Sequence, residues 1–133
     1  MAEFPGLAHV AVTVRDLSVS VPWYEALFDA KPVLDEDTDA GFHHTAYLLG
    51  NGTVLGLHQH TRAAPDEPFS EFHAGLDHIG FGCATRGELE QWQAKLDGLG
   101  VKHGGIVDAP YGSGLSFRDP DNIALEFFAP PGS

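Results

Sequence analysis

Apolar residues alternate with small or polar ones along residues 9–14, which is the period of a β-strand with one buried face. The apolar positions of this strand are Val10, Val12 and Val14. The opposite face carries His9, Ala11 and Thr13. A histidine therefore stands on the face that is free of bulky apolar side chains.

A helix is predicted after this strand, because Asp16 and Ser18 are both suitable helix caps. We expect it to extend to about Ala30, since Pro32 prevents its continuation. Pro22 is tolerated only in the first turn of a helix, so a late or irregular start is expected. The side chains that this helix is expected to bury are Trp23, Leu27 and one of Val19 and Ala26.

The first half of the chain is predicted to end in a hairpin. A solvated acidic loop at 35–41 leads to a strand at 42–49, and Gly50-Asn51-Gly52 forms the turn. The strand at 53–60 returns with its own alternation. Residues 62–75 contain prolines, a glycine and charged residues, and they are expected to form a linker or lid.

The second half repeats this plan. Ile79, Phe81 and Cys83 form an apolar strand face, and Thr85 with Glu88 fits a helix capping box. The following helix is expected to bury Leu89, Trp92 and Leu96 and to stop at Gly98 or Gly100. The remaining predicted segments are a short strand at 105–107, a flexible loop at 109–114 and two strands at 115–118 and 123–129.

The two halves are related by a nearly constant offset. His78 follows His9 by 69 residues, as Trp92 follows Trp23. With one extra residue in the later loop, Glu126 corresponds to Gly56. Such a repeat predicts an α+β fold of two paired βαβββ modules, which form a curled mixed sheet around a metal cleft. The expected organisation is a single domain over 1–133, with a first module at 6–61, a linker at 62–75 and a second module at 76–129.

Composition is consistent with this plan and excludes some classes of partner. The 133 residues are 43% hydrophobic, which suits one compact domain, and no apolar run approaches the roughly 20 residues of a membrane helix. A net charge of −12 argues against nucleic acid and anionic membrane partners. The chain begins without a secretion-signal pattern, so a cytoplasmic location is expected. Cys83, the single cysteine, is interpreted as a buried thiol.

Three chemically capable side chains occupy the small, polar faces of separate strands: His9, His78 and Glu126. A lone strand histidine is usually only a hydrogen-bonding residue, but a glutamate within an apolar strand is costly unless it has a partner. Two imidazoles and one carboxylate form a known ligand set for a catalytic metal. The small neighbours Ala11 and Gly80 would leave coordination positions open for water and substrate.

The chain resembles the vicinal oxygen chelate superfamily, which includes glyoxalase I, fosfomycin-resistance and bleomycin-resistance proteins, methylmalonyl-CoA epimerase and extradiol dioxygenases. The matching stretches are His9–Val12, Trp23-Tyr24, Leu76–Ile79 and Phe117–Glu126, which is similar to the closing hairpin of the family. The resemblance covers essentially the whole chain. It implies one divalent metal ion (Fe, Mn, Ni, Co or Zn) at His9, His78 and Glu126, a small-molecule substrate and a homodimer.

Departures from the family pattern bear on the reaction. Gly56 stands where glyoxalase I and the epimerases place a fourth ligand, and in glyoxalase I that residue is also the base. His58, on the same face, is a candidate base and substrate contact. Phe117 lacks the hydroxyl of the tyrosine that extradiol dioxygenases place nearby. The loop at 110–114 is poorer in serines and acids than the potassium-binding loop of fosfomycin-resistance enzymes. Bleomycin-binding members lack the metal triad, so its presence favours catalysis.

Further substrate contacts are predicted at Ser116, Tyr111, Tyr47 and Phe117. For Ser116 and Tyr111 the alternative is a solvent-exposed residue, and the face that Tyr47 occupies is left open. The favoured function is a glyoxalase-like lyase or isomerase that chelates its substrate through vicinal oxygens. The alternatives are an Fe(II)-dependent dioxygenase of the extradiol type and a non-catalytic protein that sequesters an antibiotic or other ligand.

Overall fold

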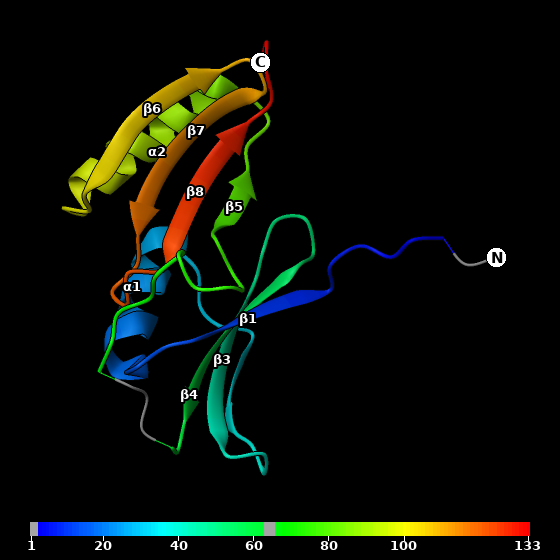
Figure 1. Cartoon of the computed structure of the whole chain (residues 1–133), viewed down its shortest axis with the longest axis vertical. Helices are drawn as coiled ribbons and strands as arrows, with labels where there is room; N and C mark the ends of the chain where they lie inside the picture. The colour runs from blue at the N-terminus through cyan, green and yellow to red at the C-terminus, as the bar shows by residue number, and fades with distance from the viewer. Residues whose placement is uncertain (1–2, 63–65) are drawn as a thin grey trace. The chain divides into compact units, whose positions relative to one another are not determined.

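The computed structural model describes residues 3–62 and 66–133, which fall into two compact units that divide between Asp66 and Glu67. In the described residues, each unit contains one four-stranded sheet and one helix (Figure 1). Part of the predicted linker, residues 63–65, lies outside the described residues. Its second half, from Glu67 onwards, belongs to the second unit.

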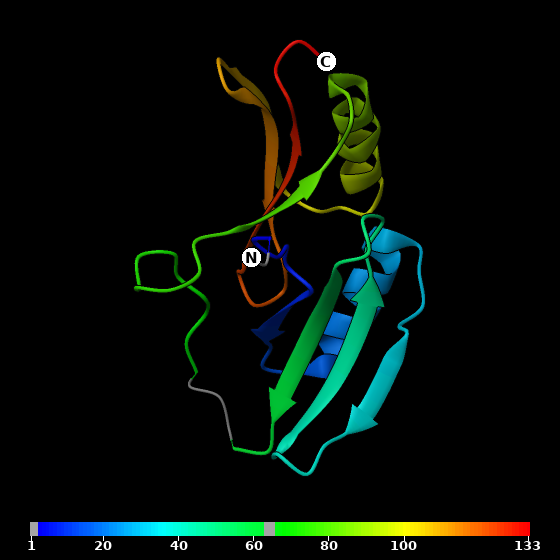
Figure 2. The same ribbon diagram turned by 90° about the vertical axis from the view of Figure 1, so that its right-hand side faces the viewer.

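The first unit has the strand order β1-β4-β3-β2. Strand β1 is parallel to β4, and the other neighbours are antiparallel. Helix α1 covers one face of this sheet, as Figure 2 shows. The elements of the unit are β1 (His9–Thr13), α1 (Leu17–Phe28), β2 (Leu34–Asp37), β3 (Phe42–Leu48) and β4 (Val54–His60).

The second unit has the corresponding order β5-β8-β7-β6, with β5 parallel to β8. Its elements are β5 (Ile79–Gly82), α2 (Arg86–Gly98), β6 (His103–Ala109), β7 (Gly112–Arg118) and β8 (Ala124–Ala129). The same order and the same parallel pair in both units confirm the duplicated βαβββ plan. The strands form two separate mixed sheets and do not close into a barrel.

Two predicted loops are wrong. Residues 34–37, which include the start of the acidic stretch, form β2, and this strand pairs with β3 at the edge of the sheet. All four β2 side chains are exposed, so the strand shows no alternation of apolar and polar residues. The segment at 109–114 is a tight hairpin, in which Pro110 and Tyr111 connect the longer strands β6 and β7.

The helix caps follow the prediction. The Asp16 side chain accepts a hydrogen bond from the Ser18 amide, and Thr85 accepts one from the Glu88 amide. The Glu88 carboxylate in turn accepts from the Ala84 amide at 2.8 Å. Pro22 lies inside α1, beyond its first turn, so the expected late start of this helix is wrong.

Bulky residues on one face of each sheet pack against its helix. In the first unit the largest fully buried side chains are Tyr24, Leu27, Tyr47, Leu55 and Leu57. In the second they are Leu89, Leu96, Leu115 and Leu125, beside a stack of Trp92, Phe127 and Phe117. Cys83 is buried as predicted, and burial raises the pKa of its thiol. The helices of the described residues are too short or too polar to span a membrane.

Candidate metal centre

Glu126 lies on the open face of the second sheet, with its carboxylate beside two glycines of the neighbouring strands. A Cβ added at Gly114 on β7 would lie 3.1 Å from Glu126 Oε2, and one added at Gly80 on β5 would lie 3.9 Å from Oε1. Ser116 is paired with Glu126 in the β7–β8 register. Within the described parts of the chain, no hydrogen bond or ion pair engages the Glu126 carboxylate. Its oxygens are therefore available to a ligand.

His78 stands immediately before β5 and lines the same pocket as Glu126 and Ser116. Its Nδ1 atom lies 2.6 Å from Asp77 Oδ1. Because a carboxylate accepts a hydrogen bond, the proton of the neutral ring is on Nδ1 and Nε2 carries the free lone pair. A carboxylate in this position orients a histidine as the outer partners of metal-bound histidines do.

The guanidinium group of Arg118 also lines this pocket. Arg118, the last residue of β7, donates to both carboxylate oxygens of Glu71 at 2.9 Å. It also donates to the Asn122 carbonyl. The paired Arg118 lowers the pKa of Glu71 to about 2, so this carboxylate is charged throughout the neutral range.

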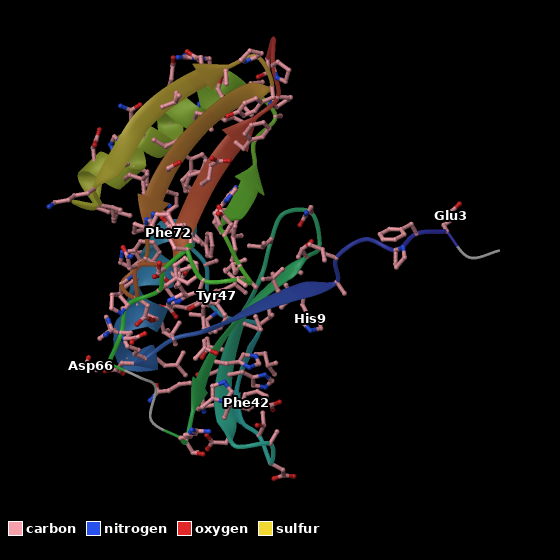
Figure 3. The ribbon with its side chains drawn as sticks, viewed as in Figure 1. Glu3, His9, Phe42, Tyr47, Asp66 and Phe72 are labelled. Atoms are coloured by element: carbon pink, nitrogen blue, oxygen red, sulfur yellow. The ribbon has the colours of Figure 1, made fainter. Side chains whose placement is uncertain are left out.

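The open face of the first unit carries His9 and His58. His9 begins β1 and is exposed, as Figure 3 shows. On β4, a Cβ added at Gly56 would lie 3.4 Å from His58 Nε2 and 3.5 Å from the Ala11 Cβ. The His58 ring therefore leans over Gly56, which is the position that the repeat relates to Glu126.

His58 is also the histidine of this face whose pKa is shifted. Its ring stacks on Phe42 and lies near His44 and His60. Burial lowers the pKa of His58, and the nearby charges of His44, His60 and His9 lower it further. The imidazole is consequently neutral at pH 7 and is able to accept a proton.

The predicted ligands are brought together only in part. His78 and Glu126 share one pocket of the second unit, and His9 belongs to the first unit. Among residues 3–62 and 66–133, no three His, Cys, Asp or Glu side chains are gathered closely enough to hold a metal ion. The complete set of three ligands therefore stays a prediction.

The predicted substrate contacts divide into two groups. Ser116 lies on the open face beside Glu126, and Tyr111 is exposed at the β6–β7 turn. Tyr47, in contrast, is only 1% exposed and donates to the Val21 carbonyl of α1, so its placement as a substrate contact is corrected. Burial raises the pKa of Tyr47 to about 12. Phe117 borders the pocket, but its ring is 3% exposed and stacks on Phe127 in the core.

Sequence reasoning assigned no role to Asp77, Arg118 or Glu71. For Asp77 a signal was available, because a carboxylate beside a suspected metal-binding histidine is a usual orienting partner. The contact between Glu71 and Arg118 joins residues 47 positions apart. No spacing rule relates a loop glutamate to a strand arginine, so this pair had no sequence signal.

Comparison with known proteins gives consistent results. The model of the Glyoxalase/Bleomycin resistance protein/Dioxygenase superfamily matches residues 6–127. The metallothiol transferase FosB of Bacillus licheniformis is 33% identical over 128 residues, which cover 91% of this chain and 73% of the relative.

Solved structures share the fold. A glyoxylase/bleomycin resistance protein/dioxygenase domain from Frankia sp. has a TM-score of 0.88 and 31% identity, covering 98% of this chain and 96% of that one. A mutant of the fosfomycin resistance protein FosX from Listeria monocytogenes, complexed with Mn(II) and 1S,2S-dihydroxypropylphosphonic acid, has a TM-score of 0.69. It is 19% identical, with 95% of this chain and 93% of that one covered.

Proposed function

Because the chain belongs to the Glyoxalase/Bleomycin resistance protein/Dioxygenase superfamily, we propose that it is an enzyme that holds one divalent metal ion through His9, His78 and Glu126. The observation that carries this proposal is the pocket that His78 and Glu126 share. There the glutamate has no protein partner within the described residues, and the histidine is oriented by Asp77.

The donor set fits such an ion. One carboxylate and two imidazoles accept several divalent metals, and the glycines beside Glu126 leave space in front of its oxygens. Among Fe, Mn, Ni, Co and Zn, the FosX complex makes Mn(II) the first ion to test. When bound, the ion supplies a Lewis acid for two neighbouring oxygens of a small substrate.

The side chains around the ion carry the remaining roles. Ser116, beside Glu126, would donate a hydrogen bond to a substrate oxygen. His58, which is kept neutral on the other open face, would take up the proton that the substrate loses. These roles correspond to a glyoxalase-like lyase or isomerase.

A second candidate reaction is the transfer of a thiol to the substrate. The relative at 33% identity is a metallothiol transferase, which favours this reaction. In either case we propose that the active form is a homodimer.

Metal content tests the proposal directly. Wild-type protein incubated with Mn(II) and then desalted should retain one ion per chain by mass spectrometry of the metal. His78→Ala and Glu126→Ala should retain less than a tenth of that amount. The control is His73→Ala, because His73 is an exposed loop residue of the same unit. Retention by all four proteins alike would disprove the site.

Two further measurements assign the reaction and the source of the ligands. The Mn(II) protein should consume fosfomycin or a hemithioacetal in the presence of a thiol, and the metal-free protein should not. Oxygen uptake with a catechol would instead indicate the dioxygenase, and ligand binding that survives metal removal would indicate sequestration. Mixing His9→Ala with Glu126→Ala chains restores metal binding only if two copies share a site.

A further inference from the structure

Arg118 is the one arginine or lysine among the described residues that line the pocket of His78 and Glu126. The other charged groups of that wall are carboxylates: Glu71, Asp77 and Glu126. The whole chain has 7 basic and 19 acidic residues, so a basic group at this position is not explained by composition. A guanidinium binds oxyanions through two parallel hydrogen bonds.

The Glu71 carboxylate makes this bidentate interaction with Arg118, and each of its oxygens lies 2.9 Å from an Arg118 nitrogen. It comes from the segment 67–75, which has no helix or strand. The segment is tied to the β7–β8 turn at Phe69, whose amide donates to Asp121 and whose carbonyl accepts from Asn122. Beyond Glu71 the neighbouring Phe72 is 91% exposed. A carboxylate on such a segment is free to leave without breaking a sheet.

The ion pair is also open to solvent. The Arg118 side chain is 42% exposed and that of Glu71 is 26% exposed. A two-point pair of arginine and carboxylate is stronger than an ordinary surface ion pair, but at this exposure water and salt still compete with it. A ligand oxyanion that reaches Arg118 therefore competes with one solvent-accessible carboxylate of the chain.

We propose that Arg118 binds an acidic group of the substrate, a carboxylate or a phosphoryl-type oxyanion, and that Glu71 occupies its place until the substrate arrives. This inference deepens the proposed function, since the substrate would lie in the pocket of His78 and Glu126. The acidic group exchanges with the Glu71 carboxylate, and the segment 70–73 moves away from the pocket. Arg118 is in this way a specificity-determining residue, and Glu71 is an internal competitor.

Anion binding to metal-free protein tests the exchange. Inorganic phosphate and acetate are titrated separately, and the arginine side-chain Nε–H signals are followed by NMR. Glu71→Gln should bind phosphate about tenfold more tightly than the wild type, because the competing charge is gone. Arg118→Gln should lose this binding. Preference for phosphate or acetate identifies the kind of oxyanion.

The matched control is Arg86→Gln. Arg86 likewise donates to both carboxylate oxygens of an acidic residue, Asp108 of the same unit. Its phosphate affinity should equal that of the wild type. Unchanged affinity in Glu71→Gln would overturn the proposal, even if Arg118→Gln failed to fold. Equal loss of binding in Arg86→Gln and Arg118→Gln would also overturn it, because it would show a general effect of charge.

The use of metal-free protein separates this inference from the proposed function. Loss of the metal site would appear in the metal content alone and would leave the phosphate titration unchanged. With an active substrate, Glu71→Gln should lower KM at constant kcat, whereas Arg118→Gln should raise KM.

Discussion

The imidazole of His58 stacks on the ring of Phe42, with centroids 4.3 Å apart and planes inclined by 12°. Phe42 and His60 face each other across β3 and β4, as do His44 and His58. Figure 3 marks Phe42 at this end of the first sheet. Three imidazoles thus surround one phenyl ring, and a positive charge on His44 or His60 disfavours a proton on His58.

Acid should therefore weaken the first unit through His58. Its pKa in the folded protein is lowered, so the unfolded chain binds the proton more readily. The stability from the neutral ring is present above the ordinary pKa of about 6.5 and is lost as the pH falls through the lower folded value. Urea unfolding at pH 7.5 and 5.5 should show a smaller acid loss in His58→Asn than in the wild type.

His43 should show the opposite dependence on pH. Its ring contacts Asp35 and Asp37 of β2, and the hydrogen bond to Asp35, followed by that to Asp37, raises its pKa. The stability from this charged ring is present below about 6.5 and is lost as the pH rises through the higher folded value. In His43→Gln the unfolding free energy should fall less between pH 6 and pH 9 than in the wild type. An identical fall in both proteins would contradict the pairing.

The space around Glu126 should control metal binding. In Gly114→Ala the new Cβ would lie 3.1 Å from Oε2 and 3.3 Å from Cδ of Glu126, so the carboxylate must shift. Mn(II) affinity, measured by calorimetry, should fall about tenfold, as it does when the support of a ligand is disturbed.

Gly80→Ala is the matched control for that change. Its Cβ would lie 3.9 Å from Oε1, which is an ordinary contact, so affinity should stay near the wild-type value. Equal losses in the two variants would mean that the glycines act through backbone flexibility.

The sequence predicted the structure well wherever burial of one face makes apolar and polar residues alternate. The alternation around Val12 and Leu125 and the offset between His9 and His78 predicted the strands, the repeat and the open faces correctly. Strand β2 was missed because an exposed edge strand has no apolar face to show. Tyr47 was misplaced because its strand is interior on both sides: Ala46, its neighbour on the opposite face, is also buried.

The site was predictable only as far as the repeat extends. His78 and Glu126 stand at positions related to His9 and Gly56, so symmetry pointed to them. The pair of Arg118 and Glu71 depends on where a segment without helix or strand crosses a hairpin turn. No local pattern along the chain encodes such a contact.

The turn between β6 and β7 should not accept a side chain at Gly112, the first residue of β7. Gly112 has φ of +141°, and a Cβ there would lie 2.4 Å from the Phe128 ring and 2.6 Å from the Ala129 carbonyl oxygen. The clash with backbone cannot be relieved by a rotamer change. Gly112→Ala should therefore lower the unfolding free energy in urea by at least about 2 kcal/mol. Gly104→Ala, whose Cβ would lie 3.9 Å from its nearest neighbour, should lower it by less than about 1 kcal/mol. If the segment at 109–114 were instead a flexible loop, Gly112→Ala would lower the unfolding free energy no more than Gly104→Ala does.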